Sequence, residues 1–169
     1  MHLGKLYNKI AELYQVQANY STANTYHQKA FELYEASKNT FGTASTNTGW
    51  ANLNKEQGNY TEAIRYARKA VSSYQSIDNY CKTSEPLKVM GESYLHQEQP
   101  DTALIFLLNA EQVANKCSDL VILTDVNHLI GKVYDDLEDE EQAFSYYKQA
   151  MVLAQKSHYR EVLMKTART

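Results

Sequence analysis

Alanine recurs along this chain at a constant spacing of 40 residues. Two rows of alanine and one row of alanine or glycine follow this period: Ala23, Ala63, Ala103 and Ala143; Ala30, Ala70, Ala110 and Ala150; and Ala11, Ala51, Gly91 and Gly131. Self-similarity at such a period is typical of proteins built from stacked repeats. A small residue lets two helix backbones approach to about 8–9 Å, so we interpret these rows as packing positions.

The repeated segments are predicted to be helical. Apolar residues follow helical spacing, as in Tyr26, Ala30 and Leu33. The 169 residues include only 6 glycines and 2 prolines, which leaves little material for turns. Each unit is therefore predicted to contain two amphipathic helices.

Turns between the paired helices are also visible in the sequence. Gly58 and Asn19 suit the left-handed C-cap of a helix, and Thr61 and Ser21 suit the N-cap of the next helix. Pro100 plays the same part in the third unit, because proline cannot continue a helix. These signals place a turn in the middle of each unit.

These features resemble the tetratricopeptide repeat (TPR) family, in which a small residue and an aromatic mark the first helix and two alanines mark the second. The small position and both alanine positions are met in all four units, and the aromatic position holds Tyr14, Asn54, Tyr94 and Tyr134. Ala67 departs from the large residue that the family has between the alanines, and neither the first-helix tryptophan nor the closing proline stands at its position. The resemblance implies an all-α, right-handed superhelical solenoid of helix-turn-helix repeats.

The unit of this chain is longer than the family's usual ~34 residues. Six additional residues fall between units, at 38–43, 79–84 and 119–124. Since no proline ends the second helix, longer helices are expected to absorb them. The pattern is similar to the long-helix variant of bacterial peptide-sensing regulators and kinesin-light-chain-like adaptors.

We predict a single solenoid domain over residues 1–169. Its four units lie at about 4–43, 44–83, 84–123 and 124–158. Residues 159–169, which include Tyr159, Val162 and Leu163, are predicted to begin a partial fifth helix, either of a further unit or as a cap. We expect the chain to be a fragment of a larger regulator or adaptor.

Common catalytic signatures are missing from the sequence. It holds no G-x-S-x-G, P-loop or H-E-x-x-H motif and no close Cys/His pair. We therefore predict no enzyme activity, no cofactor and no metal. His96 and His128 could face the same groove, but a structural or solvated role is favoured over metal ligation.

Charge and hydropathy limit the classes of partner. The net charge of −3, with scattered Lys and Arg, argues against nucleic acid. No apolar run approaches the ~20 residues of a membrane span. The acidic run 135–141 is interpreted as a solvated turn with carboxylates at a helix start, with docking of a basic partner as the alternative.

The two cysteines and the single tryptophan are given structural roles. Cys81 and Cys117 belong to no C-x-x-C pair, and we interpret them as free, half-buried thiols in the reducing cytoplasm. A disulfide would require a proximity that the sequence does not show. Trp50 aligns with large apolar residues in the other units, so we interpret it as core, with an exposed ligand anchor as the alternative.

The family resemblance implies that the first helices line a concave face that binds a peptide. The predicted groove residues are Asn8, Lys9, Glu12, Thr48, Asn52, Lys55, Lys88, Glu92, His96, His128 and Lys132. Asparagine can both donate to and accept from a peptide backbone, so Asn8 and Asn52 are the preferred backbone readers, with purely solvated groove residues as the alternative. The Lys and Asn clamp of chaperone-binding members is missing, which makes a chaperone C-terminus a poor candidate ligand.

The sequence thus predicts a cytoplasmic scaffold module that binds a protein or peptide. Two alternatives stay open. One is a structural module that forms homo-oligomers through exposed terminal helices. The other is the sensory or regulatory domain of a larger signalling enzyme.

Overall fold

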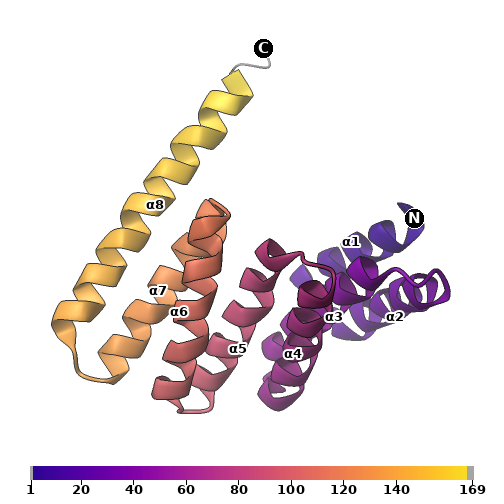
Figure 1. The fold of residues 1–169 in the computed structure, drawn as a ribbon, viewed down its shortest axis with the longest axis horizontal. Coiled ribbons are helices and arrows are strands. Elements are labelled where there is room, and N and C mark those ends of the chain that lie inside the picture. Colours follow the sequence, from indigo (N-terminus) through magenta and orange to yellow (C-terminus); the bar gives the residue numbers. More distant parts are fainter. Residues whose placement is uncertain (1, 167–169) are drawn as a thin grey trace.

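Residues 2–166 are described by the structure, a computed structural model, with side-chain environments given as far as His158. The chain folds into antiparallel pairs of helices that stack side by side (Figure 1). The elements are α1 His2–Val16, α2 Tyr20–Ala36, α3 Thr40–Glu56, α4 Tyr60–Ser76, the 3₁₀ turn η1 Tyr80–Thr83, α5 Ser84–His96, α6 Pro100–Lys116, α7 Leu120–Asp136 and α8 Glu140–Thr166. The prediction of an all-α solenoid is confirmed.

A left-handed residue ends seven of the helices and recurs every 20 residues. These residues, all with positive φ, are Ala18, Lys38, Gly58, Asp78, Glu98, Ser118 and Glu138. Each is followed by a residue whose backbone N–H bonds back into the preceding helix, as Asn19 N does to Tyr14 O at 2.9 Å. Turns within and between units are therefore alike. Longer helices absorb most of the additional residues 38–43 and 119–124, as predicted, but residues 79–84 include η1 and the start of α5, which has only 13 residues, so the prediction is wrong at that junction.

The predicted cap residues need correction. Gly58 does hold the left-handed position, with φ +77°. In the first unit that position belongs to Ala18, and Asn19 is instead the N-cap of α2, where its side chain accepts from Thr22 N at 3.3 Å. Ser21 and Thr61 lie inside the helices that they were predicted to cap.

The last helix differs from the predicted partial fifth helix. α8 runs without a break from Glu140 to Thr166, so residues 159–166 continue the second helix of the fourth unit. It extends well beyond the other helices (Figure 1). The side chains of Tyr159, Val162 and Leu163 lie outside the described part of the structure. Glu140 and Glu141 occupy the first turn of α8, which confirms the helix-start interpretation of the acidic run.

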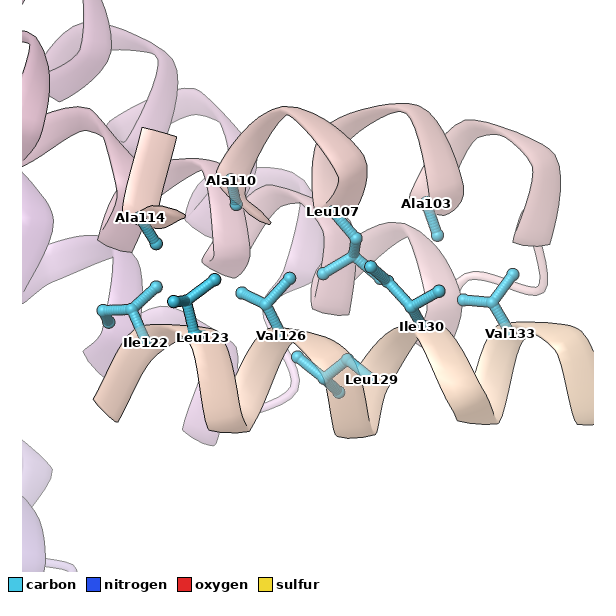
Figure 2. Close-up of a cluster of buried hydrophobic side chains, with 10 residues drawn as sticks. All are labelled: Ala103, Leu107, Ala110, Ala114, Ile122, Leu123, Val126, Leu129, Ile130 and Val133. Atoms are coloured by element: carbon cyan, nitrogen blue, oxygen red, sulfur yellow. The ribbon is translucent and has the colours of Figure 1, made fainter. Parts of the chain in front are cut away.

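The alanine rows form the packing seams, as predicted. Ala23, Ala63, Ala103, Ala30, Ala70 and Ala110 are completely buried, and so are Ala11 and Ala51. Between α6 and α7 the seam widens into a cluster of larger side chains centred on Leu107, Val126 and Ile130, which point toward one another in Figure 2. Burial of such side chains contributes about 25 cal/mol per Å² of apolar surface.

In the third and fourth units glycine replaces alanine in the small-residue row, because the facing side chain comes too close for a Cβ. A Cβ at Gly91 would lie 2.5 Å from Leu107 Cγ, and one at Gly131 would lie 2.6 Å from the Tyr147 ring. In the second unit the facing residue is Ala67, and Ala51 fits. Ala67 thus departs from the family pattern by being small, and the alanine at position 51 of the same unit fits beside it.

Trp50 lies in the core, as predicted. Its side chain is 6% exposed, its ring packs beside Phe31 and Tyr66, and its indole N–H donates to Asn24 Oδ1 at 2.8 Å. A buried tryptophan needs such a partner for its N–H.

The cysteines differ from the prediction of free thiols. Cys81 and Cys117 form a disulfide with their Cα atoms 5.8 Å apart, and Cys81 is exposed rather than half-buried. The bond joins η1 to the end of α6. Pro86 lies just after η1, and because proline has no N–H to bond back by one helical turn, the helix pair starts here with a 3₁₀ turn.

Candidate functional site

The first helix of each pair forms an inner layer. α1, α3, α5 and α7 contact one another in succession, whereas among the described residues α2, α4, α6 and α8 have no such mutual contacts. Helices that approach on one side and separate on the other curve the stack toward the approaching side. The predicted groove residues all belong to these first helices.

Two hollows adjoin each other on this inner layer. The larger, about 450 Å³, lies between α1, α3, α4 and α5, and the smaller, about 380 Å³, lies toward the start of α1. They share Glu12, Ser45 and Lys82. Thr48 and Asn52 line the larger hollow, and Asn8 and Lys9 line the smaller one.

Asn8 takes part in a buried polar cluster. Only 6% of the residue is exposed; its Nδ2 donates to Thr46 Oγ1 at 3.0 Å, and its Oδ1 lies 3.0 Å from His27 Nδ1. Since the amide oxygen can only accept, we place the imidazole proton on Nδ1. These bonds use the Asn8 amide within the protein, so we do not include Asn8 among the ligand-reading groups.

Asn52 is the other predicted backbone reader, and it lies in the larger hollow. Its Nδ2 donates to Glu85 Oε1 at 3.2 Å and lies 3.4 Å from Thr48 O. Thr48 itself donates to Ala44 O at 3.1 Å, as a threonine inside a helix often does. Asn52 is half-buried, and its Oδ1 can accept from a bound ligand.

Ion pairs link neighbouring first helices beyond the hollows. Lys55 Nζ lies 2.6 Å from Glu92 Oε2, and Lys88 Nζ lies 3.0 Å from Asp125 Oδ2 and 3.1 Å from Glu85 Oε2. Burial lowers the pKa of Lys88, but the combined attraction of Glu85 and Asp125 outweighs it, so the pKa is raised. These charged groups pair with one another and hold neighbouring units together.

The remaining predicted residues are dispersed. Lys9 and Glu12 form an exposed pair within α1 at 2.6 Å. His96 stacks on Tyr60 with ring centroids 4.8 Å apart, and the exposed His128 ring lies 5.7 Å from that of Tyr147. Lys132 is exposed on α7. The structure therefore brings Glu12, Thr48 and Asn52 together and leaves the two histidines apart from the hollows.

Family models match two stretches of the sequence, residues 3–76 and 124–157, and both describe the tetratricopeptide repeat. Together they cover more than half of the chain. This chain belongs to the tetratricopeptide repeat family. No curated protein sequence matches it significantly.

Solved structures share the TPR fold at low sequence identity. Aspartyl phosphate phosphatase F from Bacillus subtilis superposes with a TM-score of 0.84 at 20% identity, over 92% of this chain and 41% of its own. RapI, in its apo form, superposes with a TM-score of 0.82 at 16% identity, over 98% of this chain and 60% of its own. BtubC from P. vanneervenii superposes with a TM-score of 0.77 at 17% identity, over 92% of this chain and 65% of its own. The TPR chain thus spans less than two thirds of the length of each.

Sequence reasoning missed several residues that line the hollows, namely Lys5, Phe41, Tyr74, Lys82 and Glu85. Lys82 lies among the additional residues between units, for which the family pattern has no position. Tyr74 belongs to a second helix and is 4% exposed. Its place at the hollow follows from how α4 packs behind α3, which periodicity alone does not reveal.

Two features are missing from the described part of the chain. Across residues 2–158, no three His, Cys, Asp or Glu side chains are close enough together to hold a metal ion. No helix among those described has the length and apolar character needed to cross a membrane.

Proposed function

We propose that this TPR chain is a scaffold module that binds an extended peptide segment of a partner in the two hollows of the inner layer. The observation that carries the proposal is the open space that α1 and α3 line with polar residues such as Glu12, Ser45 and Asn52. Asn52 offers an amide oxygen to a peptide N–H, while Glu12 and Lys82, which line both hollows, offer opposite charges.

The comparisons support this proposal through the fold. YrrB, whose structure is described as a TPR protein with an unusual peptide-binding site, superposes with a TM-score of 0.50 at 20% identity, over 95% of this chain and 90% of its own. A signal transduction ATPase from Pyrococcus horikoshii has a TPR sensor. It superposes with a TM-score of 0.75 at 21% identity, over 94% of this chain and 25% of the ATPase chain. A regulatory role within a larger signalling protein is consistent with both.

The repeat register supplies a variant that fills the hollow without opposing the fold. Position 45 corresponds to Lys5, Glu85 and Asp125 in the other units, so a long polar side chain is compatible with it. We would select peptides from a random library with the wild-type chain, with Ser45→Lys and with Ser145→Lys, which makes the same change on the exposed surface of α8. Motifs enriched by the wild type and Ser145→Lys but lost with Ser45→Lys are expected. Equal enrichment by all three would place binding elsewhere.

A second candidate function is homo-oligomerisation through the first helix. Leu3, Leu6 and Leu13 are 48%, 55% and 65% exposed on α1, whereas the corresponding Thr43, Thr46 and Leu53 of α3, which follows the pair α1 and α2, are buried. The face that docks onto a preceding helix at the inner junctions is therefore open on α1. Light scattering over a concentration series tests this: Leu6→Glu should lower the mass of any oligomer, and a monomer at all concentrations would rule the oligomer out.

A further inference from the structure

A third trough lies away from the inner layer, between the second helices α2 and α4. Its volume is about 680 Å³. Thr43 and Asn47 of α3 lie between the two walls, and Phe31 and Ile64 supply apolar surface from α2 and α4. The trough is open because α2 and α4 do not contact each other.

Positive charge collects along one wall of this trough. Arg65, Arg68 and Lys69 follow one another at helical spacing on α4, and the carboxylate of Glu35 is the only acidic group among the lining residues. Arg65 is paired with Glu62 and lies over the Tyr66 ring, so part of its charge is engaged. Arg68 and Lys69 are exposed. The hydroxyls of Ser72 and Ser73 continue the same wall.

The same position two units later provides a comparison within the molecule. A hollow of about 380 Å³ between α6 and α8 is lined by residues that stand 80 positions further along the chain, with Asn127 in the place of Asn47. Its wall holds Lys148 and Gln149 in the places of Arg68 and Lys69, and Val152 and Leu153 in the places of the two serines. The frame of the trough is thus repeated, but the cationic wall belongs to the α2–α4 trough.

We infer that the α2–α4 trough binds a short acidic peptide segment of a partner protein, in which an apolar side chain is flanked by carboxylates. The apolar side chain packs between Phe31 and Ile64, and the carboxylates pair with Arg68 and Lys69. Asn47, which lines the trough, offers its side-chain amide to the peptide backbone. This site goes beyond the proposed function, because it lies between the second helices and shares no lining residue with the inner hollows.

Charge complementarity favours an acidic peptide over an extended polyanion. The chain as a whole has a net charge of −3, so the excess of basic residues in the trough is local and matches a short anion. In addition, a phosphate backbone has no apolar group that could pack on Phe31 and Ile64. A segment of a few residues that combines carboxylates with an apolar side chain fits the lining best.

Two matched charge reversals test this inference. The probe is a fluorescein-labelled peptide, blocked at both ends, with a leucine flanked by two glutamates on each side, and its control has glutamines in place of the glutamates. We expect the glutamate peptide to bind the wild type and Lys148→Glu equally, and Arg68→Glu to weaken binding by about tenfold, as the loss of one partly desolvated ion pair plus a new repulsion does. Circular dichroism checks that both variants stay folded.

Three other outcomes would overturn the inference. If the glutamine peptide binds as well as the glutamate peptide, the carboxylates play no part. If Lys148→Glu weakens binding as much as Arg68→Glu, only overall charge matters. If the wild type binds no peptide but associates with itself, and Asp136→Lys prevents this, the acidic turn of a second copy is the occupant. Ser45→Lys should leave binding of this peptide unchanged, which separates the trough from the inner hollows.

Discussion

His27 is a buried polar residue at a position where the other units have Ala67, Leu107 and Tyr147. It is 1% exposed, its Nδ1 faces Asn8 Oδ1, and its Nε2 has no partner among the described residues. Burial lowers the pKa of His27 to about 4. A proton on Nε2 would be a buried, unpaired donor, which explains why the neutral ring is preferred.

This histidine should make stability depend on pH. The unfolded chain takes up the proton near pH 6.5, whereas the folded chain resists it down to about 4, so the free energy of unfolding falls as the pH drops between these values. A shift of this size corresponds to a total loss of about 3 kcal/mol. Urea unfolding between pH 7 and 5, a range chosen above most carboxylate pKa values, should show this slope in the wild type and lose most of it in His27→Gln. The same slope in both would contradict the assignment.

Gly91 and Leu107 illustrate packing that is matched at the level of two residues. Because a Cβ at Gly91 would lie 2.5 Å from Leu107 Cγ, we expect Gly91→Ala to destabilise the chain by about 1–3 kcal/mol. The second unit already pairs Ala51 with Ala67 at these positions. Gly91→Ala combined with Leu107→Ala should therefore lose less stability than the sum of the two single changes, as a double-mutant cycle by thermal melting measures. Strict additivity would mean that the two side chains do not limit each other.

Helix ends show what the sequence could and could not predict at the scale of elements. The 40-residue period placed the helix pairs, since packing rows depend only on side-chain size and spacing. The residues that usually favour turns were a poorer guide to the helix ends. Seven residues hold the left-handed conformation, and only Gly58 among them is a glycine. The turns instead follow a constant spacing of 20 residues, and a residue such as Ala18 accepts a conformation that it does not favour.

The disulfide should stabilise the start of the third helix pair. It closes a loop of 36 residues between η1, the 3₁₀ turn that precedes α5, and the end of α6. The loop-entropy model gives about 4 kcal/mol for a loop of this size. We expect a reducing agent to lower the melting temperature of the wild type by several degrees and to leave Cys81→Ser/Cys117→Ser unchanged at the lower value. A melting temperature of the wild type that does not respond to reduction would contradict this role.

At the scale of the whole molecule, the inner layer could be predicted from the repeat register, but its contacts could not. Asn8 and Asn52 both belong to first helices; one is closed into a cluster with Thr46 and His27 and the other lines a hollow. The difference depends on how far successive units rotate, which the sequence pattern does not give. The disulfide removes one premise of a second expectation, because the cytoplasmic prediction rested partly on free thiols.

Stability in a stack of repeats is shared between neighbours, and Ala63 tests this directly. It is fully buried in a cluster that joins the second unit to Val89 and Met90 of the third. Ala63→Trp is therefore expected to cost about 1–3 kcal/mol or more by overpacking and to reduce hydrogen-exchange protection in α5 as well as in α3 and α4. Ala143→Trp, at the same register of the fourth unit, should affect mainly α7 and α8. If Ala63→Trp disturbed only its own helix pair, or left the melting temperature unchanged, the proposed coupling between units would not hold.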